Sequence, residues 1–182
     1  MKVTSTSIPA VRIIEPAVFG DDRGYFMETW RSSRFRELVD DVEFVQDNYS
    51  FSSKGILRGI HYQVQQPQGK LVRVVIGEVL DVAVDLRRSS PTFGQWVGER
   101  LSAENKRQLW VPAGFGHAFI VLSDVAGFEY KCTDYYAPEH ERCIRWDDPD
   151  LNIDWLLEPG QEPQLSGKDA VAPLLADSEV FE

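Results

Sequence analysis

The chain has few cysteines, no long apolar run and little positive charge, and each shortage excludes a class of protein. Its two cysteines, Cys132 and Cys143, are too few for the disulfide framework of a small secreted domain. There is no run of about 18 apolar residues and no charged-then-apolar leader, so we expect neither a membrane span nor a signal peptide. The formal net charge of -10 argues against nucleic acid or an anionic membrane as partner, because both bind basic surfaces. We therefore expect a cytoplasmic protein with reduced thiols, whose ligand can be a small anion if a few Arg and Lys side chains converge.

The sequence predicts one domain over residues 1–182. A chain of this length buries roughly 70 % of the surface that its unfolded form exposes, which is enough for a proper core. It contains no internal repeat, no low-complexity tract and no linker rich in Gly, Pro or Ser that would divide it.

Period-two alternation of side chains is the dominant pattern in the chain. In "VLDVAVDL" the residues Leu80, Val82, Val84 and Leu86 fall on one face, which predicts a half-buried strand. Similar runs recur as "KLVRVVI", "RQLWVP", "HAFIVLS" and "FEYKCTDYY", and turn signals separate them. Many short antiparallel strands are typical of an all-β sandwich or barrel.

Only "SSRFRELV" predicts a helix. Phe35, Leu38 and Val39 lie at helical spacing, and Ser32 or Ser33 is the expected N-cap. We expect this helix to be peripheral to the strands.

The spacing of histidines matches half of the metal site of a cupin, the double-stranded β-helix or jelly roll. "GILRGIHYQ" fits the first cupin motif with His61 and Gln63, "KLVRVVIG" fits its end with Lys70, and "PAGFGH" fits the second motif with His117. Two ligand positions therefore hold Gln63 and Lys70. A protonated lysine repels a divalent cation, and two histidines alone seldom hold one. The pattern predicts a jelly roll whose metal has been replaced by an ammonium that can stabilise an oxyanion.

Longer segments carry a closer resemblance. "FGDDRGYFMETW", "FVQDNYSFSSKGILRGIHYQ", "YKCTDYYAPEHERCIRWDDPDL" and "LSGKD" resemble the dTDP-4-dehydrorhamnose 3,5-epimerase family, and the likeness spans nearly the whole chain. It implies a homodimeric isomerase without metal or cofactor that acts on dTDP-4-dehydro-6-deoxy-D-glucose, in the pathway to dTDP-L-rhamnose. Three alternatives stay open: an epimerase of carbon 3 only on a related nucleotide-linked 4-ketosugar, a metal-dependent cupin oxygenase, and a jelly-roll sugar binder without catalysis.

Epimerisation beside a ketone needs a base, an enolate stabiliser and an acid. The resemblance implies that His61 is the base and that Asp169 orients its ring. An unperturbed histidine pKa of about 6.5 leaves a usable neutral fraction at physiological pH. Lys70 shares strand parity with Val72 and Val74, so it points inward, and the resemblance assigns it to the carbonyl of the substrate.

The acid is assigned by resemblance to Tyr130. A phenol with a pKa of about 10 is protonated at neutral pH and can donate. The residues alone do not favour Tyr130 over Tyr135 or Tyr136. His117 alternates with Phe119 and should face the same cavity. We expect it to form a hydrogen bond with the substrate there.

Arg58 poses a geometric question. Strict alternation sends Arg58 and His61 to opposite faces, whereas the resemblance places both in the substrate site. A glycine within a strand often marks a bulge, so we predict a bulge or kink at Gly59.

The resemblance also assigns the remaining substrate contacts. They are Phe19, Arg23, Glu28, Gln46, Asp47, Asn48, Glu141 and Lys168. It further implies that the N-terminal segment, about residues 1–50, lies in a dimer contact and reaches the site of a partner subunit, and that the C-terminal tail, about residues 156–182, closes the site.

Overall fold

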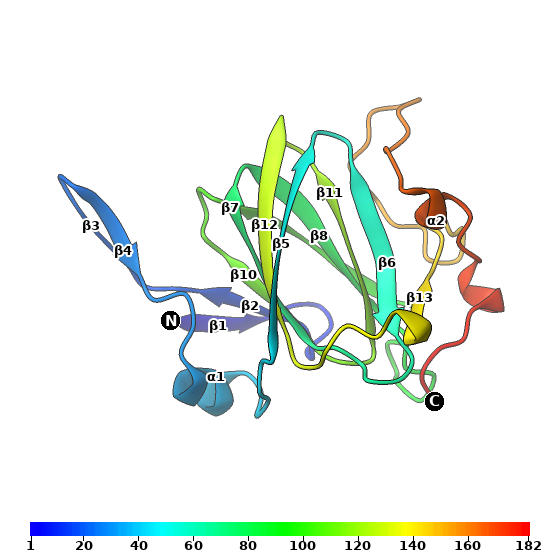
Figure 1. The fold of residues 1–182 in the computed structure, drawn as a ribbon, viewed down its shortest axis with the longest axis horizontal. Helices are drawn as coiled ribbons and strands as arrows, with labels where there is room; N and C mark the ends of the chain where they lie inside the picture. Colours follow the sequence, from blue (N-terminus) through cyan, green and yellow to red (C-terminus); the bar gives the residue numbers. More distant parts are fainter.

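Antiparallel strands make up most of the protein in a computed structural model that describes residues 1–182 (Figure 1). The strands are β1 (Lys2–Ser5), β2 (Arg12–Glu15), β3 (Val18–Asp21), β4 (Gly24–Met27), β5 (Gln46–Ser53), β6 (Leu57–Gln63), β7 (Lys70–Ile76), β8 (Glu78–Asp85), β9 (Trp96–Ser102), β10 (Gln108–Val111), β11 (Phe115–Val121), β12 (Val125–Cys132) and β13 (Glu141–Cys143). The helical elements are α1 (Ser32–Leu38), α2 (Gly167–Ala170) and two 3-10 turns, Pro138–His140 and Leu175–Asp177.

Two main sheets pack face to face and confirm the predicted jelly roll. One sheet has six strands in the order β1-β2-β10-β7-β12-β5, and the other has five in the order β13-β6-β11-β8-β9. Inward side chains of both sheets form one core, in which the rings of Phe119 and Phe128 stack with centroids 4.2 Å apart. Each of the five runs that alternation predicted as strands overlaps an observed strand: β7, β8, β10, β11 or β12.

Strand β8 is buried on both faces, so the prediction that it is half-buried is wrong. Its Leu80 and Val82 pack under a second core that includes Trp155 and Leu175 of the C-terminal segment. Its opposite face points into the space between the sheets, where Asp81 is fully buried. Alternation therefore identified the two faces correctly but could not show that a distant segment covers the outer one.

Strand β6 contains the predicted irregularity at Gly59. His117 pairs with His61 and Phe119 pairs with Arg58, so two steps along β11 match three along β6. Gly59 has a φ of 114°, and a Cβ there would lie 2.5 Å from the carbonyl oxygen of His117. Only glycine fits this close approach, and the bulge brings Arg58 and His61 to the same cavity.

Helix α1 lies at the predicted position and at the periphery of the sheets (Figure 1). Its N-cap is Arg31, without a side-chain cap bond, so the prediction of Ser32 or Ser33 is wrong. Phe35 anchors the helix through an edge-to-face contact with Trp110 at 5.2 Å. None of the helices has the length and hydrophobicity needed to cross a membrane.

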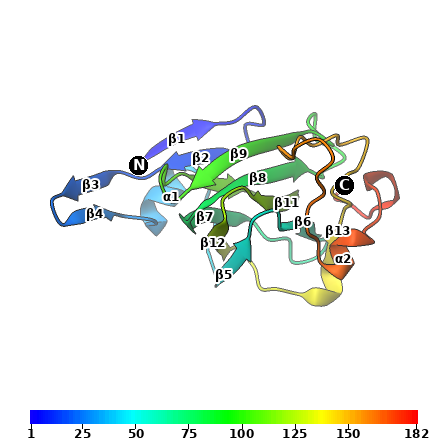
Figure 2. The same cartoon turned by 90° about the horizontal axis from the view of Figure 1, so that it is seen from above.

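The β3–β4 hairpin projects from the body of the molecule (Figures 1 and 2). It pairs only with itself, and its Phe19, Tyr25 and Phe26 rings are exposed, with Phe19 at 66 %. Exposed aromatic residues on a two-stranded hairpin are unusual for an isolated chain, because such a hairpin has little stability of its own in water.

Candidate active site

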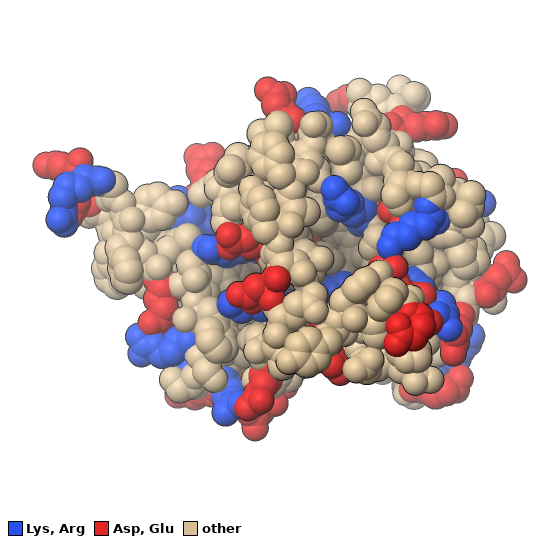
Figure 3. All heavy atoms as spheres, in the orientation of Figure 1, with Lys and Arg blue, Asp and Glu red and all other residues tan.

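A cavity of about 330 Å³ lies between the inner faces of the two sheets. Figure 3 shows the face of the molecule that carries this hollow, with blue Lys and Arg side chains around it. Strands β5, β7 and β12 line one side, and β6 and β11 line the other. The structure brings together there nine of the residues that the sequence singled out: Gln46, Asn48, Arg58, His61, Lys70, His117, Tyr130, Glu141 and Lys168.

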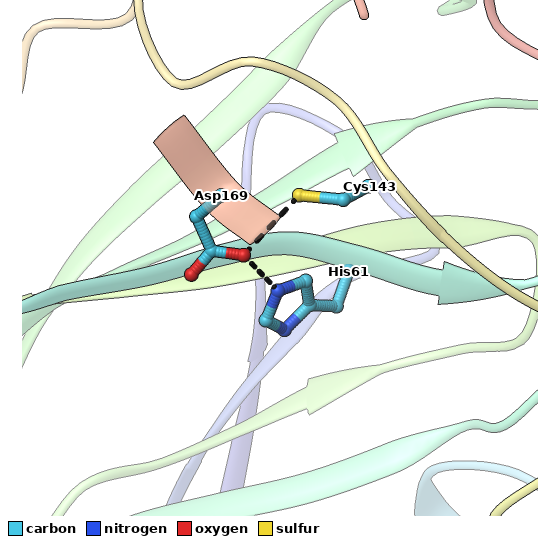
Figure 4. A group of neighbouring side chains, drawn as sticks. All are labelled: His61, Cys143 and Asp169. Atoms are coloured by element: carbon cyan, nitrogen blue, oxygen red, sulfur yellow. Dashed lines mark hydrogen bonds and ion pairs between the residues drawn. The ribbon is translucent and has the colours of Figure 1, made fainter. Parts of the chain in front are cut away.

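His61 and Asp169 form a hydrogen-bonded pair at the wall of this cavity. The Nε2 atom of His61 lies 2.6 Å from Oδ1 of Asp169, and Figure 4 shows the second ring nitrogen pointing away from the carboxylate. Asp169 is almost fully buried behind the ring. The pair therefore has the arrangement in which a carboxylate fixes the tautomer of a catalytic imidazole.

The C-terminal segment positions Asp169 beside His61. Gln164 exchanges backbone hydrogen bonds with the start of β6, at 2.8 Å to the Gly55 carbonyl and 3.0 Å from the Leu57 N–H. The Ser166 hydroxyl then caps α2 by accepting from the Asp169 N–H at 3.2 Å. These contacts set where the carboxylate of Asp169 stands.

Asp169 is held ionised. Burial raises the pKa of its carboxyl, but the hydrogen bond and the charge of His61 oppose it, as do contacts with Ser166 and Cys143. The net pKa lies below the ordinary value. An ionised Asp169 requires that Nε2 of His61 carry the proton in the pair, so the Nδ1 lone pair is free in the neutral ring.

Lys70 lies inside the cavity, as its strand parity predicted. Burial lowers the pKa of its ammonium, and the negative groups Glu141 and Asp81 oppose that effect. Its Nζ is 6.0 Å from the centre of the Tyr130 ring. A cation that is short of hydration and directed into a cavity is well placed to stabilise a developing oxyanion.

His117 faces the same cavity and has a partner that the sequence did not reveal. Its Nε2 lies 2.9 Å and 3.0 Å from the two oxygens of Asp81. Burial raises the pKa of the Asp81 carboxyl, while His117 and Lys70 act in the opposite direction. An aspartate within the apolar run "VLDVAVDL" was the signal available in the sequence for this contact.

Tyr130 lies across the cavity from His61. Tyr130 belongs to β12 of the six-stranded sheet, whereas His61 belongs to β6 of the five-stranded sheet. Burial raises the pKa of the Tyr130 phenol above its ordinary value, so the hydroxyl stays protonated. A phenol that can donate a proton and an imidazole with a free lone pair therefore lie on opposite walls of the cavity.

Gln63 is a structural residue. Its amide nitrogen donates to the carbonyls of Gln66 and Tyr135 at 2.7 Å and 3.2 Å, and its oxygen accepts from the Ala137 N–H at 2.9 Å. Gln63 occupies a position that holds a metal ligand in the cupin motif. Its side chain holds the 135–137 segment against β6 and is absent from the cavity lining.

Five residues of the cavity lining were not among the predicted site residues: Ser50, Gln68, Phe119, Phe128 and Tyr136. Tyr136 is half exposed at the rim, and its hydroxyl lies 3.2 Å from Glu141, which also binds Lys168 at 2.7 Å. The Ser50 hydroxyl lines the cavity and is buried without a hydrogen-bond partner in the protein. An unpaired buried hydroxyl is costly, so Ser50 is available to a ligand.

Four predicted binding residues lie outside this cavity. The carboxylate of Asp47 accepts from Lys131 at 2.9 Å and 3.0 Å on the outer side of β5. Arg23 pairs with Asp21 on the hairpin, beside Phe19, and Glu28 pairs with Arg31. Within one chain, the N-terminal members of the predicted set are therefore turned away from His61.

Comparison with known proteins gives a consistent family. A family model described as dTDP-4-dehydrorhamnose 3,5-epimerase matches residues 5–177. A protein of that name from Pseudomonas aeruginosa is 61% identical over 182 residues, covering 100% of this chain and 99% of the relative. Another from Shigella flexneri is 57% identical over 183 residues, with 100% and 99% covered.

Solved structures with ligands are also similar. An epimerase from Legionella pneumophila in complex with dTDP-4-keto-L-rhamnose has a TM-score of 0.94 at 57% identity, covering 98% of this chain and 94% of that one. A 3'-monoepimerase from Streptomyces bikiniensis in complex with dTDP-quinovose has a TM-score of 0.87 at 39% identity, covering 94% and 87%. Epimerases of one and of two carbons therefore share this fold.

Proposed function

The chain belongs to the dTDP-4-dehydrorhamnose 3,5-epimerase family, and on this premise we propose that it inverts carbons 3 and 5 of dTDP-4-dehydro-6-deoxy-D-glucose to give dTDP-4-dehydro-L-rhamnose. It is an isomerase of the pathway to dTDP-L-rhamnose. The observation that carries the proposal is the His61–Asp169 pair on one wall of the cavity with Tyr130 on the other.

The reaction begins at His61. The ionised Asp169 accepts the Nε2 proton, and the free Nδ1 lone pair removes the proton from a carbon next to the C4 ketone. Asp169 then stabilises the imidazolium that forms. The electrons of the broken C–H bond move to the ketone oxygen and give an enolate.

Lys70 stabilises that enolate. Its ammonium lies in the cavity between the sheets, where its interaction with a developing oxyanion is stronger than in bulk solvent. His117, fixed by Asp81, presents its second ring nitrogen on the same side and binds a polar group of the sugar.

Tyr130 returns a proton from the opposite face. Donation from the β12 wall to the carbon that was deprotonated from the β6 wall inverts its configuration. The same three groups serve the second flanking carbon once His61 has released its proton to solvent and Tyr130 has taken one up, because both carbons are adjacent to the one ketone.

The nucleotide end of the substrate is bound at the rim. Arg58 and Lys168 supply positive charge for the diphosphate, and Tyr136 offers an exposed aromatic face to the thymine. Gln46, Asn48 and Glu141 are polar neighbours that fix orientation.

The functional unit in this proposal is a homodimer. The projecting β3–β4 hairpin supports it, because its exposed aromatic residues need a partner surface and its Phe19 and Arg23 are remote from the cavity of their own chain. In the dimer these residues, with Glu28, complete the site of the other subunit. The residues that stay exposed on the outer side of β5, Tyr49 and Phe51, are the surface that the hairpin can cover. Two thiols without a disulfide support a cytoplasmic location.

Incubation with dTDP-4-dehydro-6-deoxy-D-glucose in deuterium oxide tests the reaction. We expect deuterium at carbons 3 and 5 of the product, located by NMR. Deuterium at carbon 3 alone would favour the 3-epimerase alternative, because the chain is also similar to a 3'-monoepimerase. Absence of label from both carbons would refute the proposal.

A further inference from the structure

Cys143 lies next to the catalytic pair and has no part in the mechanism above. It belongs to β13, where it pairs directly with His61 of β6, and its sulfur is 3.5 Å from Oδ1 of Asp169. Figure 4 shows this oxygen between the sulfur and Nε2 of His61. A nitrogen, a sulfur and an oxygen donor from three segments of the chain thus lie within 4.8 Å of one another.

The spacing of two of these donors, the sulfur and the carboxylate oxygen, fits a tetrahedral metal ion. Zinc bonds of about 2.3 Å to sulfur and about 2.0 Å to oxygen place those two ligands about 3.5 Å apart. The sulfur of Cys143 and Oδ1 of Asp169 already have this separation, 3.5 Å. Nε2 of His61 and Oδ1 lie 2.6 Å apart and must separate by roughly 0.7 Å, since two ligands at about 2.0 Å subtend about 3.3 Å.

We propose that a soft divalent metal ion of the Zn²⁺ class binds reversibly between His61, Cys143 and Asp169 and inactivates the enzyme. One thiolate, one carboxylate and one imidazole form a mixed donor set that suits zinc and its neighbours rather than magnesium or calcium. The two anionic ligands neutralise the ion, and a water molecule completes the fourth position. The nearest ammonium along the chain, on Lys168, is engaged with Glu141 at 2.7 Å.

This site differs from the cupin metal position. There the ion would share the cavity with Lys70, which repels it. The donors of the proposed site lie on the Asp169 side of the His61 ring, and the other ring nitrogen points away from them (Figure 4).

Inactivation follows from the tautomer of His61, and this step rests on the proposed function. In the free pair the proton is on Nε2 and the lone pair is on Nδ1. A metal on Nε2 moves that proton to Nδ1, and the Cys143 thiol loses its proton to solvent as the metal–sulfur bond forms. His61 then holds a proton where the base needs a lone pair. No redox change occurs.

Cobalt is the probe that reports the sulfur directly. Co²⁺ titrated into the metal-free enzyme, without substrate, should bind once per chain and give the near-ultraviolet absorption of a cobalt–thiolate bond. Zn²⁺ should displace it, and a chelator should restore the metal-free spectrum. Absence of a thiolate band at saturating cobalt would overturn the assignment.

Two cysteine variants make the test specific. Cys143→Ser should abolish the thiolate band and weaken metal binding on the order of 100-fold, since even the loss of a group outside the ligand shell costs about 10 to 100-fold. Cys132→Ala removes the other thiol and should leave the thiolate band and the metal affinity unchanged. His61→Asn should keep a weakened band, which covers the case in which Cys143→Ser does not fold. Metal binding unaffected by Cys143→Ser would refute the site.

A kinetic measurement separates this inference from the proposed function. Zn²⁺ should lower the kcat of the wild-type enzyme and have little effect on Cys143→Ser, whose hydroxyl can still donate to Asp169. If cobalt binds through Cys143 but epimerisation is not the activity, the metal site stands and the function fails. If epimerisation is observed and Zn²⁺ binds without lowering kcat, the inactivation is refuted.

Discussion

The molecule holds two histidine–aspartate pairs, and their histidines are direct partners in the ladder between β6 and β11. His61 binds Asp169, and His117 binds Asp81. The His61 side chain keeps 23% of its exposure at the cavity wall, whereas that of His117 keeps 8%. The aspartates differ more, because Asp169 belongs to the C-terminal segment and Asp81 lies within β8.

The difference shows that the surroundings shift the carboxyl pKa in opposite directions in two similar pairs. Burial raises the pKa of both carboxyls, but in Asp169 the contacts with His61, Ser166 and Cys143 leave a net lowering. In Asp81 burial outweighs His117 and Lys70 and leaves a net rise. The first pair is suited to activate a base, because its carboxylate is held ionised. The second is suited to fix a cavity wall.

Replacing each histidine by asparagine tests this comparison most severely. We expect His61→Asn to lower kcat by roughly 10³-fold or more, because it removes the base. His117→Asn should lower kcat/KM by about tenfold, the value of about one hydrogen bond. Product formation and deuterium incorporation at both carbons are the measurements. Equal losses in the two variants would mean that the pairs are not distinct in function.

Replacing each aspartate gives a smaller effect. Asp169→Asn should lower kcat on the order of 10²-fold, since the amide can hold the ring but not stabilise the imidazolium. Asp81→Asn should leave kcat within about tenfold of wild type and affect KM, because His117 only binds substrate. Steady-state kinetics in parallel with thermal unfolding separates catalysis from folding. A larger kcat loss in Asp81→Asn would contradict the assignment of the base.

The two aspartates should also give opposite dependences of stability on pH. The lowered pKa of Asp169 stabilises the fold above the ordinary value of 3.8, and this contribution is lost as pH falls through the folded pKa. The raised pKa of Asp81 gives a contribution that is present below 3.8 and lost as pH rises through the folded pKa.

Denaturant unfolding between about pH 3 and pH 6 measures this contrast. The stability difference between wild type and Asp169→Asn should shrink as pH falls below 3.8. The difference between wild type and Asp81→Asn should instead move in favour of wild type, and at higher pH, as pH falls through the raised folded pKa of Asp81 toward 3.8. Parallel curves for the two variants would contradict the opposite shifts.

We expect the smallest effect on catalysis from replacing Gln63, which lies two residues from His61. Gln63→Leu should lower the free energy of unfolding by about 1–3 kcal/mol, because the buried Ala137 N–H loses its acceptor. KM should rise as the segment that carries Tyr136 loosens, and kcat should change little. The exposed Gln65→Leu is the matched control. A large fall in kcat would show that Gln63 takes part in chemistry rather than in positioning.

Local patterns predicted much of the architecture. Parity placed Lys70 and His117 toward one cavity, the family resemblance added Tyr130, and the conflict between Arg58 and His61 predicted the bulge at Gly59. The inward direction of Lys70 and His117 needed only the geometry of a strand, whereas the bulge also needed the resemblance that places Arg58 in the site. The cupin spacing also predicted that His61, Lys70 and His117 lie in one site, because that spacing is typical of strands that face one another in a jelly roll.

Features that depend on distant contacts could not be predicted. Burial of Asp81 depends on the facing sheet and on the C-terminal cover of β8, which alternation does not reveal. The role of Gln63 depends on carbonyls about 70 residues away, as its contact with Tyr135 shows. The N-cap of α1 is Arg31 rather than a serine, and the packing of Phe35 on Trp110 is the distant contact that holds the helix in place.

The tie between Gln164 and the start of β6 has a consequence for how the enzyme matures. A ribosome makes His61, Lys70 and Tyr130 well before it makes Asp169, and the dyad spans 108 residues of chain. A nascent chain that has already paired its main strands therefore lacks an oriented base. In the proposed mechanism, catalytic competence therefore arises only when the segment that carries Gln164 and Asp169 docks, after the main strands have paired.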